Sequence, residues 1–162
     1  MRARAWCLVA CLVVAACGGE RATPREALES FRAALSAHDG AALDALTDAE
    51  SVAHRRTEVR ERRAMLDRGD DPAVAMKDMP LTADEMRRGT EADACALLLD
   101  RRSPMFADAK WLSAATIVEE TSDGPDGARI HLRGTDGVER DVWFVRERER
   151  WCYDQFRTRR TW

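Results

Sequence analysis

The clearest indication of the fold is the sequence TIVEETSDGPDGARIHLRGTDGVERDVWFVRERERWCYDQF, residues 116–156. Within it, residues 129–133 alternate strictly, with Ile130 and Leu132 on one side and charged or polar residues on the other. Such alternation is typical of a strand with one buried face. Two turns that contain glycine, SDGPDG and TDG, separate this segment from the apolar runs before and after it. The pattern predicts four antiparallel strands joined as a meander, over 116–121, 129–133, 138–146 and 151–156.

The sequence before this stretch has helical periodicity. Thr23-Pro-Arg-Glu26 has the form of a capping box with proline at the first helical position, followed by an apolar stripe. After a short second helix, residues 48–68 form a charged helical segment in which Val52, Val59 and Leu66 are seven residues apart. This narrow stripe suits a helix that lies on a core rather than inside it. Further helical patterns continue up to the strands.

Helices followed by a meander define an α+β fold, with N-terminal helices packed on a curved four-stranded antiparallel sheet. We expect a single domain over residues 23–162, with a helical half at 23–112 and the β-meander at 114–157. The composition of the whole 162-residue chain, 45% apolar and 34% charged, excludes the disordered and membrane-spanning classes.

The N-terminus has the three parts of a secretory signal. Arg2 and Arg4 precede the apolar run Ala5–Ala16, whose last residues are small, as they are before a cleavage site. A bilayer span needs roughly 20 residues, so this run is too short for a transmembrane helix. We therefore expect residues 1–16 to be a signal peptide.

Val14-Ala-Ala-Cys17 resembles the lipobox of bacterial lipoproteins, in which the cysteine receives diacylglycerol and becomes the first mature residue. The resemblance implies lipidation at Cys17, with acyl chains such as palmitate holding the protein to a membrane. Residues 17–22 would be a short membrane tether. Gly18 stands where aspartate would favour inner-membrane retention, which implies the periplasmic face of the outer membrane if the organism is Gram-negative. The alternative is an ordinary signal peptide that happens to contain a cysteine.

The charge balance shows no excess of basic residues of the kind that binds nucleic acid. The chain has 26 basic and 29 acidic side chains, and loss of Arg2 and Arg4 with the signal changes its net charge from −3 to −5. Proteins that bind nucleic acid concentrate basic charge instead. Except for Lys77 and Lys110 the basic residues are arginine, which fits either a GC-rich codon bias or binding to phosphate and anionic lipid.

The two ends of the domain resemble nuclear transport factor two-like domains. Residues 23–35 and 38–46 are similar to the opening two helices of that family, and Arg150-Trp-Cys-Tyr-Asp-Gln-Phe156 looks like its tryptophan-led final strand. The resemblance implies a curved sheet that wraps a long helix and forms a cone with a pocket. Residues 48–110 are longer than the family norm, and we interpret them as a helical insert.

If the cone is open, its walls come from the apolar side of the strands. The candidate pocket-lining residues are Trp111, Ile130, Leu132, Trp151 and Tyr153. Enzymes of this superfamily use carboxylate, histidine or tyrosine groups inside the cone. Here the alternation over 129–133 turns His131 outward, and we expect Asp141 and Asp154 at the surface. We therefore predict no catalytic residue, no cofactor and no metal site.

Cys95 and Cys152 are the cysteines of the mature chain besides Cys17. Export to an oxidising compartment favours a disulfide between them. Strand alternation argues against it. If Trp151 and Tyr153 face the helices, Cys152 lies on the other face of the sheet and points away from Cys95.

Together these patterns predict a membrane-anchored envelope lipoprotein with a non-enzymatic domain that binds a protein partner or a small apolar ligand. One alternative is a structural or assembly role, in which the helical insert docks onto an envelope complex. Another is a lyase or isomerase that acts inside the cone. An open apolar cavity would favour ligand binding, whereas a filled cone with an exposed apolar patch would favour docking.

Overall fold

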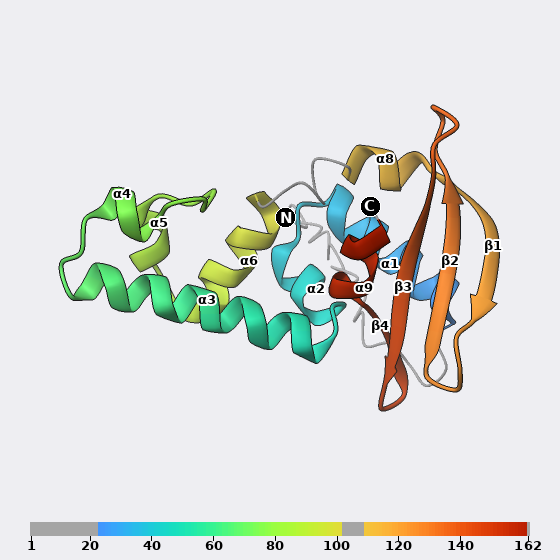
Figure 1. The fold of residues 1–162 in the computed structure, drawn as a ribbon, viewed down its shortest axis with the longest axis horizontal. Coiled ribbons are helices and arrows are strands. Elements are labelled where there is room, and N and C mark those ends of the chain that lie inside the picture. The colour runs from blue at the N-terminus through green and yellow to red at the C-terminus, as the bar shows by residue number, and fades with distance from the viewer. Residues whose placement is uncertain (1–22, 102–108, 162) are drawn as a thin grey trace, which may run out of the picture.

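A computed structural model describes residues 23–101 and 109–161 of the chain. Its helices are α1 (Pro24–Ser36), α2 (Gly40–Ala45), α3 (Ala49–Asp67), α4 (Pro72–Ala75), α5 (Ala83–Arg87), α6 (Glu91–Arg101), α8 (Ala109–Ala114) and α9 (Gln155–Thr161) (Figure 1). Its strands are β1 (Thr116–Ser122), β2 (Gly127–Arg133), β3 (Glu139–Glu147) and β4 (Arg150–Tyr153). The predicted α+β class, with N-terminal helices packed against a four-stranded antiparallel open sheet, is confirmed.

The strand order is β1-β2-β3-β4, as expected of a meander. Ile130 on β2 pairs with Val142 on β3, and both side chains are fully buried. Because side chains alternate along a strand, His131 points to the opposite face of the sheet. Gly124 and Gly137 have φ angles of +77° and +79° in the two turns, a conformation that glycine adopts without strain.

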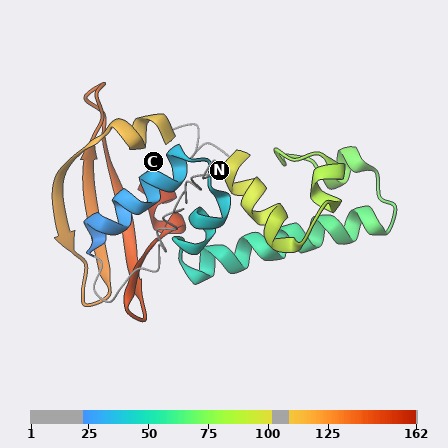
Figure 2. The same cartoon turned by 180° about the vertical axis from the view of Figure 1, so that it is seen from behind.

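Helix α1 begins with the predicted capping box and lies against the buried face of the sheet (Figure 2). Thr23 Oγ1 accepts a hydrogen bond from Glu26 N at 3.2 Å, and Glu26 Oε2 accepts one from Thr23 N at 2.7 Å. The apolar stripe of α1, which includes Leu28, Phe31 and Leu35, joins the side chains of the strands in one cluster. We call this cluster the sheet core.

The link between α2 and α3 is tied to the end of β4. Tyr153 N donates to the carbonyl of Leu46 at 2.8 Å, and Asp48 N donates to the carbonyl of Tyr153 at 3.1 Å. Asp48 also caps α3, because its Oδ1 accepts a hydrogen bond from Ser51 N at 2.8 Å. These contacts fix the start of α3 beside the β3–β4 hairpin, and α3 runs from there away from the sheet (Figure 1).

Residues 49–101 form a helical arm with a second apolar cluster, separate from the sheet core (Figures 1 and 2). Val59 and Leu66 are buried in it, and Val52 is half-buried, in agreement with a narrow apolar stripe on α3. Arginine side chains tie the arm together: Arg63, for example, donates to the carbonyls of Met86 and Thr90, each at 2.8 Å. Part of the arginine content therefore stabilises loops and helix ends.

Strand β4 is shorter than predicted, because a helix that the sequence pattern did not reveal follows it. The predicted strand over 151–156 is wrong beyond Tyr153, and α9 begins at Gln155. Asp154 starts this helix, since its Oδ1 accepts a hydrogen bond from Arg157 N at 2.8 Å. Helix α9 packs on β3, where Trp143 N donates to Thr158 Oγ1 at 2.9 Å.

Candidate functional site

All five candidate pocket-lining residues lie at the sheet core. Ile130, Leu132 and Tyr153 have at most 1% of their surface exposed, and the two tryptophans among the candidates are half-buried against the same cluster. The ring of Phe31 on α1 stacks on the ring of Tyr153, with centroids 4.4 Å apart. These side chains lie together in one cluster, where they form packed core.

His131 lies on the outer face of the sheet, as the alternation predicted, and it has two partners there. Its Nδ1 is 2.8 Å from Asp141 Oδ1, and its Nε2 is 3.1 Å from Glu139 Oε2. These hydrogen bonds, first the one to Asp141, raise the pKa of His131 above its usual value. Arg133 Nε donates to Glu139 at 2.7 Å and lowers the pKa of that carboxyl. The group is a cross-strand charge network.

The expectation that Asp141 and Asp154 lie at the surface is wrong, since both are half-buried. Asp141 is held by its hydrogen bond to His131, and 22% of its side chain is exposed. Asp154 is partly covered because it caps α9, and this burial raises the pKa of its carboxyl. Both carboxylates therefore have structural partners that the alternation of residues along the strands did not indicate.

Of the three cysteines of the predicted mature chain, Cys17 lies outside the described residues. Cys95 and Cys152 are fully buried and both are free thiols, so the predicted disulfide is not formed in the structure. Cys95 belongs to the apolar cluster of the arm. Cys152 pairs with Val145 on the sheet face opposite to that of Tyr153, as strand alternation requires. Burial raises the pKa of both thiols.

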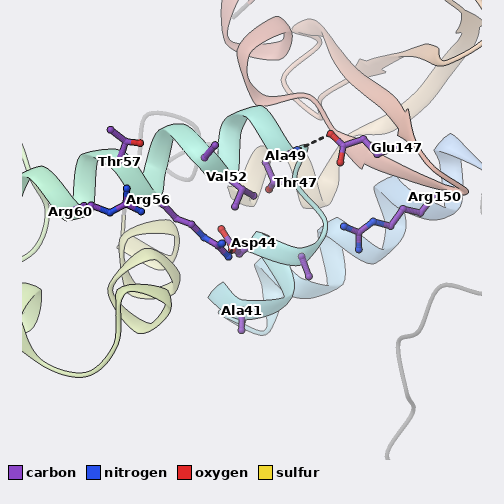
Figure 3. A pocket seen from close by; sticks show the side chains of 12 residues that line it. Ala41, Asp44, Thr47, Ala49, Val52, Arg56, Thr57, Arg60, Glu147 and Arg150 are labelled. Carbon is purple, nitrogen blue, oxygen red and sulfur yellow. Dashed lines mark hydrogen bonds and ion pairs between the residues drawn. The ribbon is translucent and has the colours of Figure 1, made fainter.

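An open hollow lies where α2, the start of α3 and the β3–β4 hairpin meet (Figure 3). Its volume is about 630 Å³, within the range of roughly 300–1,000 Å³ that is typical of ligand sites. The lining residues are Ala41, Asp44, Ala45, Thr47, Ala49, Val52, Ala53, Arg56, Thr57, Arg60, Glu147 and Arg150. None of them was among the predicted site residues, and we take this hollow as the candidate functional site.

Small side chains from two helices leave the hollow open. Ala41 and Ala45 are one turn apart on α2, and Ala49 and Ala53 are one turn apart on α3. All four alanines are exposed. A ligand could therefore approach both helices closely.

The two acidic residues of the hollow are already engaged. Asp44 Oδ1 accepts a hydrogen bond from the buried Arg55 at 2.9 Å, in an ion pair. Glu147 Oε1 accepts one from Ala49 N, in the first turn of α3, at 2.7 Å (Figure 3). A carboxylate is stabilised at a helix N-terminus, so Glu147 has a structural role there.

The three arginines of the hollow are more available to bind a ligand than its two carboxylates are. Arg56 and Arg60 are one turn apart on α3, and their side chains are 49% and 68% exposed. Arg56 lies 3.7 Å from Asp44, and Arg60 donates two long hydrogen bonds to Glu91, at 3.3 Å and 3.4 Å. Because the arginine side of each pair is exposed to solvent, we expect each pair to contribute only about 0–1 kcal/mol. Arg150, on β4, interacts with the thiol of Cys152 and has no ion pair with any residue that the structure describes.

The hollow is suited to electrostatic binding of an acidic group. None of its twelve lining residues is a histidine, cysteine, tyrosine or lysine, and both carboxylates have partners. Proton transfer would need a titratable group poised toward a substrate. The spacing of Arg56 and Arg60 was visible in the sequence, but the approach of Arg150 from β4 was not.

Within residues 23–101 and 109–161, no group of three or more His, Cys, Asp or Glu side chains could hold a metal ion. No helix in that part of the chain has both the length and the apolar character needed to cross a membrane. Comparison with family models, curated proteins and solved structures gives no match. The site is therefore interpreted from its own geometry.

Proposed function

We propose that this protein is an envelope lipoprotein, anchored by acyl chains on Cys17, whose domain binds a protein partner and catalyses no reaction. The signal-like residues 1–16 and the lipobox-like sequence before Cys17 support export and lipidation. The tether 17–22 would keep the domain close to the membrane surface, since it is only six residues long. Gly18 supports placement at the periplasmic face of the outer membrane of a Gram-negative cell.

The observation that carries the choice of partner is the filled space between α1 and the sheet. A nuclear transport factor two-like cone, which remains part of the proposal, would hold a small apolar ligand in that space. Three aromatic rings occupy this space. The ring centroid of Tyr153 lies 4.4 Å from that of Phe31 and 6.0 Å from that of Phe144. A protein partner, which binds an outer surface, therefore has more support than a small apolar ligand.

The helical arm favours a second candidate, a structural or assembly role in an envelope complex. The arm has its own apolar cluster and extends away from the sheet (Figure 1). A docking surface could thus lie well away from the sheet. A lyase or isomerase in the cone has the least support, because His131 and Asp141 pair on the outer face.

The anchoring half of the proposal is tested with the full chain and its Cys17→Ser variant. Mass spectrometry of the mature N-terminus should find an acylated Cys17 as the first residue. The variant should accumulate as an unprocessed precursor, because the lipoprotein peptidase requires the modified cysteine. Processing of the variant at the same bond, with a soluble product, would remove the lipoprotein assignment.

The binding half is tested by crosslinking intact envelopes and purifying the tagged full chain. We expect a discrete protein partner to be recovered with the wild-type chain. A chain that recovers no protein, or that instead co-purifies a small apolar molecule in stoichiometric amount, would contradict the proposal.

A further inference from the structure

We propose that the hollow between α2, α3 and the β3–β4 hairpin binds an acidic, extended peptide segment of the partner protein. This inference rests on the proposed function and names the surface and the chemistry that would carry it out. Four features support it: the available positive charge, the engaged acids, the open alanine floor and the mixed sign of the walls.

The first feature is a set of guanidinium groups on two sides of the hollow. Arg56 and Arg60 come from consecutive turns of α3, and Arg150 comes from β4 (Figure 3). Guanidinium groups bind carboxylates through paired hydrogen bonds, which gives geometric specificity as well as attraction. Arg56 and Arg60 now pair with Asp44 at 3.7 Å and Glu91 at 3.3 Å, but the arginine side of each pair is exposed, so an incoming carboxylate can replace these partners.

The second feature is that both carboxylates of the hollow already have partners within the protein. Asp44 holds Arg55, whose side chain is only 3% exposed, and Glu147 holds the first turn of α3. A ligand that displaced either carboxylate would leave a buried cation or a helix end without its partner. The charge that remains free to bind a ligand is therefore positive.

The shape of the hollow favours a peptide. Ala41, Ala45, Ala49 and Ala53 offer a floor without projecting side chains, so a peptide backbone with small side chains could lie on it. Asp44 and Glu147 stand on the walls among the arginines, where they would repel a compact anion such as a lipid phosphate group. An extended peptide can place single carboxylates against the arginines and avoid the acidic positions.

The test measures fluorescence anisotropy of labelled octapeptides with the full chain in detergent micelles. An octapeptide of alternating glutamate and alanine should bind about tenfold or more tightly than one of alternating glutamine and alanine, and more weakly as salt rises. The double variant Arg60→Gln/Arg150→Gln should lose that preference. The matched control, Arg68→Gln/Arg133→Gln, removes two exposed arginines from other surfaces and should keep binding within about twofold of wild type.

A substitution on the floor gives a second, sign-dependent test. Ala53 is an exposed helical position, so Ala53→Glu and Ala53→Arg should both fold. The glutamate should weaken binding of the acidic peptide, and the arginine should strengthen it. Opposite effects from one position cannot come from misfolding, and equal effects of the two variants would contradict the proposal.

Other outcomes separate this inference from its rivals. Equal binding of the acidic and glutamine peptides, or no loss in the double arginine variant, would overturn it. So would tighter binding of dihexanoyl phosphatidylglycerol, which would assign the hollow to lipid headgroups. If crosslinking recovers a partner equally with wild type and the double variant, the hollow is not its site, although the proposed function stands. If crosslinking recovers none with wild type, the function fails, and the peptide assay still tests the hollow.

Discussion

The ring of Phe31 stacks on the ring of Tyr153, with centroids 4.4 Å apart and ring planes 24° apart. This contact joins α1, at the start of the domain, to β4, near its end. Tyr153 also holds the α2–α3 link through two backbone hydrogen bonds, at 2.8 Å and 3.1 Å. One strand end therefore positions both the helix that fills the sheet core and the helix that forms the arm.

The first prediction concerns this contact. Phe31 is 2% exposed, so Phe31→Ala should lower the free energy of unfolding by about 3–5 kcal/mol through lost burial and a residual cavity. Urea unfolding followed by circular dichroism measures it. Val74→Ala is the control, because Val74 is 57% exposed and its truncation should cost no more than about 0.5 kcal/mol. Similar losses for both variants would refute a packed sheet core.

The second prediction concerns the buried arginine of the α2–α3–α9 junction. Arg55 donates to Asp44 at 2.9 Å and to Gln155 at 2.7 Å. Arg55→Ala should lower the free energy of unfolding by about 3–5 kcal/mol, since it leaves polar partners unsatisfied and opens a space. Arg68→Ala removes an arginine that is 63% exposed and should cost less than about 1 kcal/mol. The prediction fails if the two variants unfold at the same urea concentration.

The third prediction decides between the free thiols of the structure and the disulfide favoured by export. Cys95 and Cys152 are fully buried, and burial raises the pKa of each thiol. The processed, lipidated chain should therefore react slowly with a thiol reagent when it is native. When it is denatured without reductant, two thiols per chain should react. A denatured chain that shows none would instead establish the disulfide.

The fourth prediction concerns the charge network of the outer sheet face. Hydrogen bonds to Asp141 and Glu139 raise the pKa of His131, so NMR titration should give a value above about 6.5. Asp141→Asn should lower that pKa more than Glu139→Gln does, because Asp141 has the larger effect. A value at or below about 6.5 in the wild-type chain would contradict the observed geometry.

The same shift fixes the sign of a pH effect on stability. The folded state binds the His131 proton more tightly than the unfolded state does. The stabilisation is therefore complete below about pH 6.5 and is lost as pH rises through the higher folded-state pKa. His131→Asn should abolish this difference, as measured by urea unfolding at several pH values. A wild-type chain whose stability relative to the variant rises with pH would contradict the assignment.

The fold class was predictable because its signals are local. The capping box of Thr23 and Glu26, the alternation around Ile130 and the glycine turns each depend on residues within a few positions of one another. The helix after β4 was missed because its local signal is ambiguous. Asp154 can end a strand or cap a helix, and the packing of Thr158 on Trp143 decided for the helix.

The candidate site was not predictable, because its residues come from segments that the sequence keeps far apart. Arg150 and Glu147 reach the hollow from a hairpin roughly 90 positions after Arg56 and Arg60. Likewise, the sequence placed His131 outward, but only the register of β2 and β3 places Asp141 beside it.

The sequence alone was enough to predict most of the helices and strands after residue 23 and the buried face of β2. Backbone hydrogen bonding and side-chain periodicity decide these features over a few residues. Only the packing of distant segments filled the space between α1 and the sheet, buried Arg55 and placed arginines from α3 and β4 around the hollow. These features depend on which surfaces pack together, as with Arg55 and Gln155, which lie 100 positions apart and 2.7 Å from one another.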